Sequence, residues 1–422
     1  MTEPSMGVRD ILRIPDYRRL IGGQAISDIG DGITFLLLLL VIDHLTGSAA
    51  ALALMAIAEA VPQFSVGLVA GVYVDRWNRR TVMLVADLIR AGILLLVAAA
   101  ATAGIVPLLY VLGFAQSSVS TFFRPARGAL LPRIVPAEGL PAANSLAQAS
   151  QVLGSVIGAG IAGLIFSAYG AAAIGFAIDA LTFLVSFVFI SRIGGELGRI
   201  RVDPDATQRG DVRRSMLEGI AIVRGSRVLT GSLIGAAVSM LGLGAVNVLF
   251  VPLITGELAV NPAWMAGIEL AQTVAMIMAA GVVALLARRL APTTIIVLGL
   301  AGIGACIGLM AGVSAIWQVI ALLFVVGWMV TPLQAMLQTI VQTASTDATR
   351  GRVVSILQAS MSTASVASMA IGGVLADLIG VRSVYLAASA FVFLAAAVAF
   401  LVFRGASGRP AAAPVPVRAE AG

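Results

Sequence analysis

The sequence "GVYVDRWNRR" (residues 71–80) places one aspartate and three arginines within ten positions, between two long apolar segments. The chain as a whole is 59% hydrophobic and only 11% charged, so such a concentration of charge is unusual here. A short charged link between hydrophobic segments is typical of a turn that stays in water while both neighbouring helices cross a bilayer. This stretch therefore indicates an integral membrane protein with several membrane helices.

The composition supports the same conclusion for the whole chain. A soluble chain carries about 25% charged residues, and the mean hydropathy of this one is +1.01. The apolar runs are continuous and do not alternate with polar residues, which predicts an all-α integral membrane protein and excludes a membrane β-barrel. We expect twelve membrane helices, at residues 20–43, 49–73, 80–101, 105–125, 142–166, 169–191, 228–253, 263–287, 293–312, 315–340, 353–379 and 383–404.

The chain lacks residues that several classes of protein need for their function. All 27 basic residues are arginine, so a phosphate-binding Gly-rich loop with its lysine is absent, which excludes an ATP-driven pump within this chain. His44 is the single histidine and Cys306 the single cysteine. This excludes histidine-based metal clusters, a Ser-His-Asp triad and an intramolecular disulfide framework. We expect neither an enzyme activity nor a metal or cofactor, and the first twenty residues do not resemble a cleaved signal peptide.

The arginines are distributed unevenly along the chain. They precede the first helix, occupy every second link between helices, fill the central link and recur in the tail, whereas the other links contain almost no base except Arg382. By the positive-inside rule, both termini and the central loop are expected in the cytoplasm of a bacterial cell, with the protein in the inner (cytoplasmic) membrane. The basic isoelectric point, about 10.3, is therefore interpreted as a topology signal and not as nucleic-acid binding.

The chain also contains an internal repeat. The segment "SLAQASQVLGSVIGAGIAGLIFSAYG" (145–170) aligns without gaps with "SILQASMSTASVASMAIGGVLADLIG" (355–380), almost half the chain further on. The alternative is chance similarity between two helices rich in alanine and glycine. The repeat and the one long polar insertion predict two parallel six-helix repeats. We expect an N-terminal six-helix bundle (1–192), a cytoplasmic linker with an amphipathic segment (193–227), a C-terminal six-helix bundle (228–405) and a flexible cytoplasmic tail (406–422).

Together, these features resemble the major facilitator superfamily. The family signature of the link between helices 2 and 3 is glycine, three residues, Asp-Arg, two residues and two bases, and it is matched by Gly71, Asp75, Arg76, Arg79 and Arg80. The segments "FRPARGALLPRIVP", "ADLIRAG", "AIDALTFLVSF" and "RGRVVSI" resemble the branch with macrolide-efflux and enterobactin-exporter-like proteins. The resemblance covers essentially the whole chain and implies the major facilitator fold and a transport function.

Some features depart from the family pattern. The corresponding link of the second half keeps Arg288 and Arg289 but has Ala287 where the acid would stand. The antiporter-type Gly-Pro element of helix 5 reads Gly158-Ala159, and the basic motif found in helix 4 of many drug/proton antiporters is missing. The resemblance alone therefore does not imply proton antiport.

Charged residues at mid-membrane depth are candidates for proton coupling or substrate contact in a cavity between the halves, because an ionisable group is costly at that depth. The candidates are Asp28, Asp31, Glu59 and Arg90. For Asp31 and Glu59, the alternative is a structural ion pair with Arg90. For Asp28, near the cytoplasmic end of helix 1, the alternative is helix capping or solvation. Asp87 and Arg90 are expected to brace helices first and to act as a gate second.

Amides of the second half form another set of candidates. Asn247 and Gln338 are expected to line the cavity and contact substrate, and Gln334 lies four residues before Gln338 on the same helix face. The alternative for each is a hydrogen bond between helices.

Small residues in helix 5 predict close helix packing. Gly154 and Gly158 form a small-xxx-small face, which Gly163 is expected to extend.

The charged link is predicted to be part of a cytoplasmic gate. Asp75 is expected to bind the amino terminus of helix 11, near Arg352, when the cavity faces outward. Gly71 would let the helices come close, and Arg76, Arg79 and Arg80 keep the turn in the cytoplasm. The alternative is that the link is only a topological anchor. For Asp179 and Asp377, in helices 6 and 11, the resemblance implies packing or gating.

The favoured function is export of small hydrophobic or amphipathic molecules, such as drugs or antibiotics, by alternating access. The expected energy source is proton influx, with the transporter working as an antiporter. The expected partners are the substrate, protons and the lipid bilayer, with no nucleic acid, no cofactor beyond the proton gradient, and a monomeric protein. One alternative is a dedicated exporter of an endogenous siderophore or secondary metabolite. Another is a transport-inactive membrane sensor or scaffold, against which the intact charged link and the mid-depth carboxylates argue.

Overall fold

The computed structural model describes residues 6–74, 76–169, 172–198 and 212–404. In this part of the chain every regular element is a helix, and twelve helices are long and apolar enough to cross a membrane. The expected fold class, all-α with twelve membrane helices, is confirmed.

The first half contains six long helices and three short elements. The long helices are α2 (Pro15–Thr46), α3 (Ala49–Val74), α4 (Arg79–Ala103), α5 (Val106–Ile134), α6 (Leu140–Tyr169) and α7 (Ala172–Ser191). The short elements are α1 (Val8–Ile11), η1 (Ala137–Gly139) and η2 (Gly195–Gly198).

The second half repeats this plan after a linker helix. The linker helix is α8 (Val212–Gly225). It is followed by α9 (Arg227–Pro252), the π-helical turn η4 (Leu253–Glu257), α10 (Trp264–Arg289), α11 (Pro292–Met310), α12 (Ile316–Ala344), α13 (Asp347–Ile379) and α14 (Val381–Arg404).

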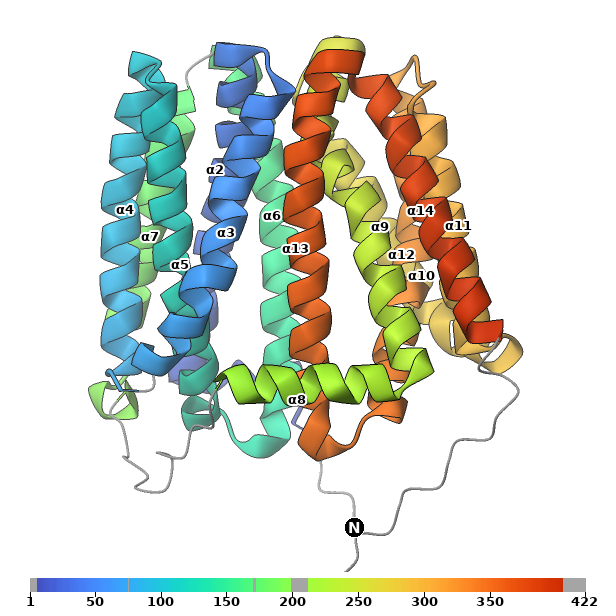
Figure 1. Ribbon diagram of the computed structural model, residues 1–422. Coiled ribbons are helices and arrows are strands. Elements are labelled where there is room, and N and C mark those ends of the chain that lie inside the picture. The colour runs from blue at the N-terminus through green and yellow to red at the C-terminus, as the bar shows by residue number, and fades with distance from the viewer. Residues whose placement is uncertain (1–5, 75, 170–171, 199–211, 405–422) are drawn as a thin grey trace, which may run out of the picture.

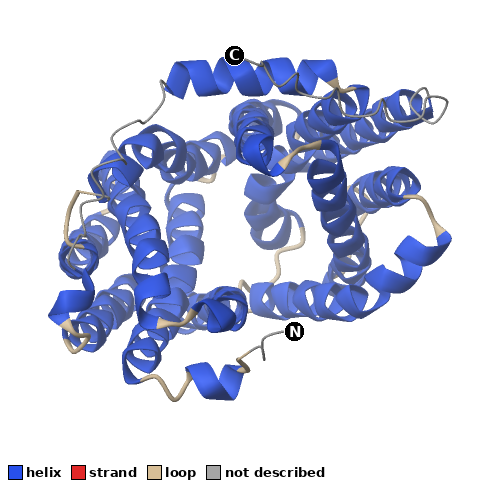
Figure 2. Ribbon diagram, turned by 90° about the horizontal axis from the view of Figure 1, so that it is seen from below, coloured by secondary structure: helices blue, strands red, loops and turns tan. Residues whose placement is uncertain are grey.

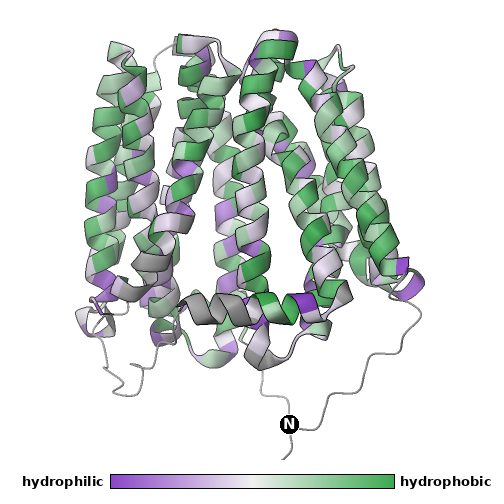
Figure 3. Ribbon diagram, in the orientation of Figure 1, coloured by the Kyte–Doolittle hydropathy of each residue, from purple (hydrophilic) through white to green (hydrophobic). Residues whose placement is uncertain are grey.

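Figure 1 shows the spanning helices standing side by side in two groups, α2 to α7 and α9 to α14, with α8 lying crosswise at one end. In the view from that end, Figure 2 shows the two groups next to each other. Val223 of α8 is buried against Leu229, Val341 and Val353, so an apolar contact fixes the linker helix to the second half. Figure 3 shows hydrophobic residues along the spanning helices and many of the hydrophilic residues near the end with α8.

Several helices are longer than the apolar runs that predicted them. The helix expected at 105–125 continues as α5 to Ile134 and contains Pro125 and Pro132. Counting apolar residues finds only the part of a helix within the hydrocarbon layer, whereas the helix itself continues into water. Prolines are tolerated because neighbouring helices and local adjustments compensate for the lost backbone hydrogen bonds.

The two halves repeat one helix contact in detail. Helix α2 packs on α6 in the first half, and α9 packs on α13 in the second. A Cβ atom on Gly32 would lie 2.9 Å from Cα of Ser155, and one on Gly244 would lie 2.5 Å from the carbonyl oxygen of Ser365. Ser155 and Ser365 are equivalent in the aligned repeats. The same close approach occurs in both halves, as expected for two related six-helix repeats.

The halves meet closely at the end opposite to α8. Helix α13 contacts α3, and α6 contacts α10. A Cβ on Gly373 of α13 would lie 2.8 Å from the carbonyl oxygen of Ala49, the first residue of α3. A Cβ on Gly163 of α6 would lie 2.7 Å from the carbonyl oxygen of Pro262, just before α10. Equivalent glycines therefore make the contacts between the halves at this end.

Candidate functional site

The mid-depth charges of the first half gather around one guanidinium, that of Arg90 in α4. Arg90 donates a hydrogen bond from Nη2 to Oδ1 of Asp31 in α2. Its guanidinium carbon lies 4.0 Å from the centre of the Phe183 ring in α7, a cation–π contact. The side chain of Arg90 is only 7% exposed, whereas that of Asp31 is 46% exposed. This ion pair thus joins a buried cation to a carboxylate that is open on one side.

Asp179 of α7 is a second acid in this region, and its carboxylate is fully buried. It accepts hydrogen bonds from Oγ1 of Thr34 at 2.5 Å and from Oγ1 of Thr182 at 2.9 Å. A Cβ on Gly30 would collide with this carboxylate, so the glycine of α2 leaves the space that Asp179 fills. Asp179 therefore packs α7 against α2.

Asp87, almost one turn before Arg90, is also fully buried. It faces Ser186 of α7, but neither its oxygens nor the serine hydroxyl form a hydrogen bond of normal geometry within the described residues. Asp87 and Asp179 are both close enough to Arg90 to interact with its charge. Arg90 braces α4 to α2 through Asp31, whereas Asp87 contributes no hydrogen bond to this brace.

Among the described residues, Arg90 forms its ion pair with Asp31 and not with Glu59 of α3. The hydroxyl of Ser117 in α5 donates to the backbone carbonyl of Glu59 at 2.5 Å, which joins α3 to α5. The Glu59 carboxyl group is near enough to Asp31 to interact with its charge. Of the two ion pairs considered for Arg90, the structure contains the one with Asp31.

Helix capping, one alternative considered for Asp28, is contradicted by its position and its partner. Asp28 accepts a hydrogen bond from Oγ of Ser150 in α6 at 2.7 Å and is partly buried. A Cβ on Gly154 would lie 2.6 Å from Cβ of Asp28, so the glycine makes room for the acid. Because α2 begins at Pro15, ahead of the apolar run, Asp28 lies well inside the helix and far from its amino-terminal end.

The glycines of α6 form two faces rather than one. On the first face, a Cβ on Gly158 would collide with the carbonyl oxygen of Ile29 and lie 2.7 Å from Cα of Gly32, both in α2. On the second, Gly163 meets the segment before α10 of the other half, as described above. The expectation that Gly163 extends the face of Gly154 and Gly158 is therefore wrong. A step of five residues turns the helix away from the first face by more than a quarter of a turn.

The amides Asn247 in α9 and Gln338 in α12 are exposed, as is Gln334, one turn before Gln338. Exposed amides are costly in lipid, so the faces that carry them are expected to border water-filled space. Glu269 in α10 is partly buried. The structure does not join these residues to the Arg90 cluster.

Two of the gate candidates contact parts of the molecule other than those expected. Arg80 donates from Nε to the carbonyl oxygen of Ile190 at 3.2 Å and from Nη2 to that of Ser191, which caps the end of α7 within the first half. A Cβ on Gly219 of α8 would lie 3.2 Å from Cβ of Arg352, so Arg352 packs against the linker helix.

The remaining gate candidates lie in or beside the link between α3 and α4. Gly71 lies in α3, Arg76 is exposed in the turn after it, and Arg79 begins α4. Asp75 lies outside the described residues.

Asp377, for which the resemblance implied packing or gating, lies at the end opposite to α8, where it contacts partners in the other half that sequence reasoning did not identify. Asp377 near the end of α13 accepts hydrogen bonds from Oγ of Ser48 at 2.6 Å and from the backbone N–H groups of Ala49 at 2.7 Å and Ala50 at 3.2 Å. A carboxylate at the amino terminus of α3 also interacts favourably with the helix dipole. We call this contact the Asp377 clamp. Serine before an apolar run is a helix-start signal, but nothing local identifies an acid more than 300 positions away as its partner.

A further hydrogen bond joins the halves near the clamp. Oγ1 of Thr255 in η4 donates to Oδ2 of Asp43 at 2.7 Å. Within the second half, Nε of Arg382 donates to Oε2 of Glu257 at 2.8 Å. Polar groups thus hold this end of the molecule together, whereas apolar contacts fix α8 at the other end.

Comparison with known proteins agrees with this architecture. The profile of the Major Facilitator Superfamily matches residues 20–305 and 232–421. Macrolide efflux protein A from Streptococcus pyogenes is 30% identical over 240 residues, which are 55% of this chain and 57% of that protein. The multidrug efflux pump Tap from Mycolicibacterium fortuitum is 26% identical over 387 residues, 89% of this chain and 92% of that protein.

Among solved structures, a bacterial homologue of the iron transporter ferroportin in the inward-facing state superimposes with a TM-score of 0.74 and 15% sequence identity. The superposition covers 94% of this chain and 99% of that chain. At this identity the likeness concerns the fold alone.

Two related bundles of six membrane helices, with a polar cluster between helices of the first, define a multi-pass membrane protein. The family profile matches most of the chain, which therefore belongs to the major facilitator superfamily. The resemblance stated from the sequence is confirmed, and the relatives that carry names are transporters, not enzymes. The chain spans 57% of the length of the Streptococcus pyogenes protein that it matches.

Proposed function

We propose that this transporter exports small hydrophobic or amphipathic molecules, such as macrolide antibiotics and other drugs, across the bacterial inner membrane by antiport with protons. The relatives named as macrolide and multidrug efflux proteins support the direction and the substrate class. The observation that carries the coupling mechanism is the Asp31–Arg90 pair, with its half-exposed carboxylate and buried guanidinium.

The charge balance around Arg90 suits a proton carrier. Asp31, Asp87 and Asp179 all interact with a single guanidinium. One positive charge balances one carboxylate, so the cluster contains more acids than its single cation can neutralise. Asp31 is its exposed member and would exchange a proton with water or be neutralised by a cationic substrate, while Arg90 holds it in place.

Alternating access would use the contacts at the two ends of the molecule. The end with α8 carries the arginine-rich links and is cytoplasmic in this proposal. Closure at the opposite, outer end is supported by the Asp377 clamp and by the Asp43–Thr255 hydrogen bond. When the outer end opens, Asp75 would bind the amino terminus of α13, and the protein would work as a monomer with both termini in the cytoplasm.

The test is transport by purified protein in proteoliposomes with an imposed pH gradient. We expect the protein to move tetraphenylphosphonium and erythromycin against protons, and an uncoupler to abolish this movement. The Asp31→Asn variant should lose the response to the gradient. Asp10→Asn, which changes an exposed acid of α1, is the matched control and should behave like the unmodified protein.

Proton coupling and drug export can fail independently in these measurements. Transport that is insensitive to the pH gradient would contradict proton coupling. Failure to transport any compound of a broad panel, together with unchanged drug tolerance in an efflux-deficient host, would contradict drug export.

A further inference from the structure

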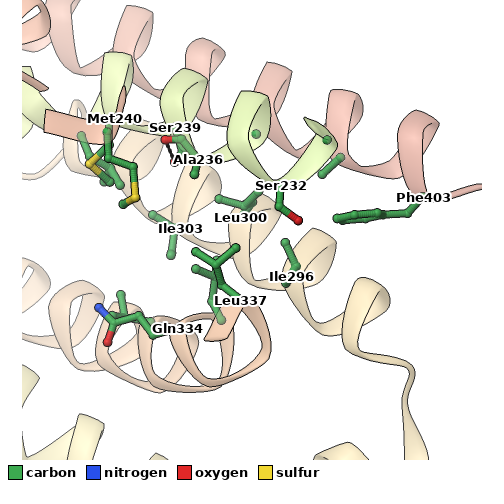
Figure 4. Close-up of a pocket in the computed structure, with 17 residues that line it drawn as sticks. Ser232, Ala236, Ser239, Met240, Ile296, Leu300, Ile303, Gln334, Leu337 and Phe403 are labelled. Atoms are coloured by element: carbon green, nitrogen blue, oxygen red, sulfur yellow. Dashed lines mark hydrogen bonds between the residues drawn. The ribbon is translucent and has the colours of Figure 1, made fainter. Parts of the chain in front are cut away.

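The second half contains a pocket enclosed within its own helix bundle. Its volume is about 120 Å³, and it lies between α9, α11, α12, α13 and α14. Figure 4 shows Ser232, Ala236 and Met240 along one side, which are spaced by four residues on α9, and Ile296, Leu300 and Ile303 of α11 opposite. This spacing places the three residues of α9 on one helix face.

The end of the pocket near Phe403 contains a hydroxyl group without a hydrogen-bond partner among the described residues. Ser232 is 6% exposed, and its Oγ atom forms no hydrogen bond within the described residues. Figure 4 shows this hydroxyl near Phe403 of α14, in otherwise apolar surroundings. Serine in a membrane helix can bond to its own backbone, as Ser239 does to the carbonyl oxygen of Ala236 at 2.8 Å. Because an unpaired buried hydroxyl is costly, Ser232 is suited to bind a polar group that enters the pocket.

The other end of the pocket borders the region between the two halves. Figure 4 shows Gln334 and Met240 at this end. Gln334 is exposed, and Gln338 is exposed on the same face of α12, which marks the side of the helix that faces away from lipid. Met361 also lines the pocket and belongs to α13, the helix that contacts α3 of the first half. A molecule between the halves could therefore insert one of its groups past Gln334 and Met240.

The size of the pocket limits what enters. A dry apolar cavity of about 150 Å³ in a protein core binds benzene, so the volume here suits one ring or a short branched alkyl group. We propose that this pocket binds a benzene-sized apolar group that bears a hydrogen-bonding substituent, with Ser232 as the partner of that substituent. The group is a lipophilic part of the exported molecule, and in this respect the inference rests on the proposed function.

Binding can be measured without any transport. Fluorine NMR of the protein in phospholipid nanodiscs would use two probes, fluorobenzene and 4-fluorobenzyl alcohol, with empty nanodiscs as the blank for partition into lipid. We expect saturable binding of both probes. Ala236→Leu adds an isopropyl group inside the pocket and should abolish saturable binding. Ala390→Leu adds the same group at an exposed position of α14 and should leave binding unchanged.

Ser232→Ala tests the polar contact separately. It should weaken binding of 4-fluorobenzyl alcohol about fivefold, which corresponds to the loss of one hydrogen bond, and leave fluorobenzene unchanged. Absence of saturable binding, or binding that persists in Ala236→Leu, would overturn the proposed site. Equal effects of Ser232→Ala on both probes would overturn the role of the hydroxyl.

A transport measurement links the pocket to the substrate. For tetraphenylphosphonium in proteoliposomes, we expect Ala236→Leu to raise KM about tenfold, as overfilling a packed site does, and Ala390→Leu to leave KM unchanged. An unchanged KM in Ala236→Leu would show that the exported molecule does not use the pocket. If the unmodified protein exported nothing, the proposed function would fail, and the NMR measurement would still decide whether the pocket binds its probes.

Discussion

The two halves of the molecule share one fold but contain different chemistry. In the first half, acids from α2, α4 and α7 surround the buried guanidinium of Arg90. In the second, the equivalent bundle encloses an apolar pocket with one unpaired serine hydroxyl. Away from the helix ends the second half carries little charge, Glu269 being an exception. The halves thus share helix contacts, while their interiors differ: the first contains buried charge and the second an apolar pocket.

The same divergence occurs at equivalent positions of the repeat. Gly158 of α6 lets the backbones of α6 and α2 touch. Its counterpart in the aligned repeat is Ser368 of α13, which donates to the carbonyl oxygen of Leu241 at 2.6 Å and accepts from the N–H of Ala245 at 2.9 Å. One helix contact relies on the absence of a side chain and the other on a hydroxyl group.

The largest expected effect concerns the charge cluster. Arg90→Met removes the cation and leaves Asp31, Asp87 and Asp179 without a counter-charge. We expect a loss of about 3–5 kcal/mol in the free energy of unfolding, because one partner of a buried pair is left behind, together with loss of export. Thermal unfolding in detergent and proteoliposome transport would measure the two effects.

Two further variants sharpen this prediction. Arg90→Met combined with Asp31→Leu should recover much of the stability but not the export. Arg382→Met breaks the more exposed pair with Glu257 in the second half and should cost less than about 1 kcal/mol. If both single variants were equally destabilised, the contrast between the halves would be wrong.

The next effect concerns the helix contacts at equivalent positions. Gly158→Ala forces a methyl group against the backbone of α2 and is expected to cost about 1–3 kcal/mol. Ser368→Ala removes hydrogen bonds without adding atoms and should cost about 1 kcal/mol or less. Unfolding in detergent measures both. As a control, Gly281→Ala places its methyl group in open space, and a destabilisation as large as that of Gly158→Ala would refute steric collision as the cause.

A smaller effect is expected from the Asp377 clamp. Asp377→Asn removes the negative charge from the amino terminus of α3, an interaction worth about 0.3–1 kcal/mol. The outer end should then open about two- to fivefold more often. Labelling of an Ala53→Cys variant by a water-soluble maleimide, with Cys306→Ser as background, would measure this. Glu138→Gln at the α8 end should not change the labelling rate, and an equal increase there would indicate a general loosening.

The smallest effect is expected at the exposed amides. Gln338→Ala should change stability by no more than about 0.5 kcal/mol, since the side chain is exposed. If Gln338 contacts the substrate, KM should change severalfold and differ between tetraphenylphosphonium and erythromycin. If Gln338→Ala changed KM by the same factor for both substrates, or not at all, Gln338 would not belong to the substrate site.

The fold could be predicted from the sequence because its signals are local or periodic. The charged link at residues 71–80, the apolar runs and the repeat each predict the arrangement without knowledge of a distant contact. The mid-depth acids could also be identified, since charge in an apolar run is conspicuous.

The Asp31–Arg90 pair was one of two ion pairs considered from the sequence. The partners of other acids could not be predicted, because they depend on helix rotation. Asp28 bonds to Ser150, and Asp377 bonds to the start of α3, across long sequence separations. The partner of Gly163 likewise depends on a turn of α6 that composition does not reveal. The unpaired hydroxyl of Ser232 is a property of the packed bundle, and a serine in an apolar run gives no sign of it.

The Asp377 clamp has a consequence for turnover. Helices α3 and α13 run in opposite directions, and the end of α13 lies beside the beginning of α3. In the sequence an acid lies near the end of α13 and another directly follows Val74, the last residue of α3. If Asp75 acts at one end as Asp377 does at the other, the two closures compete, and strengthening either one slows the cycle. Transport rate should then pass through a maximum when both closures are of similar strength, so that weakening Asp377 could speed up a variant whose inner closure is already weak.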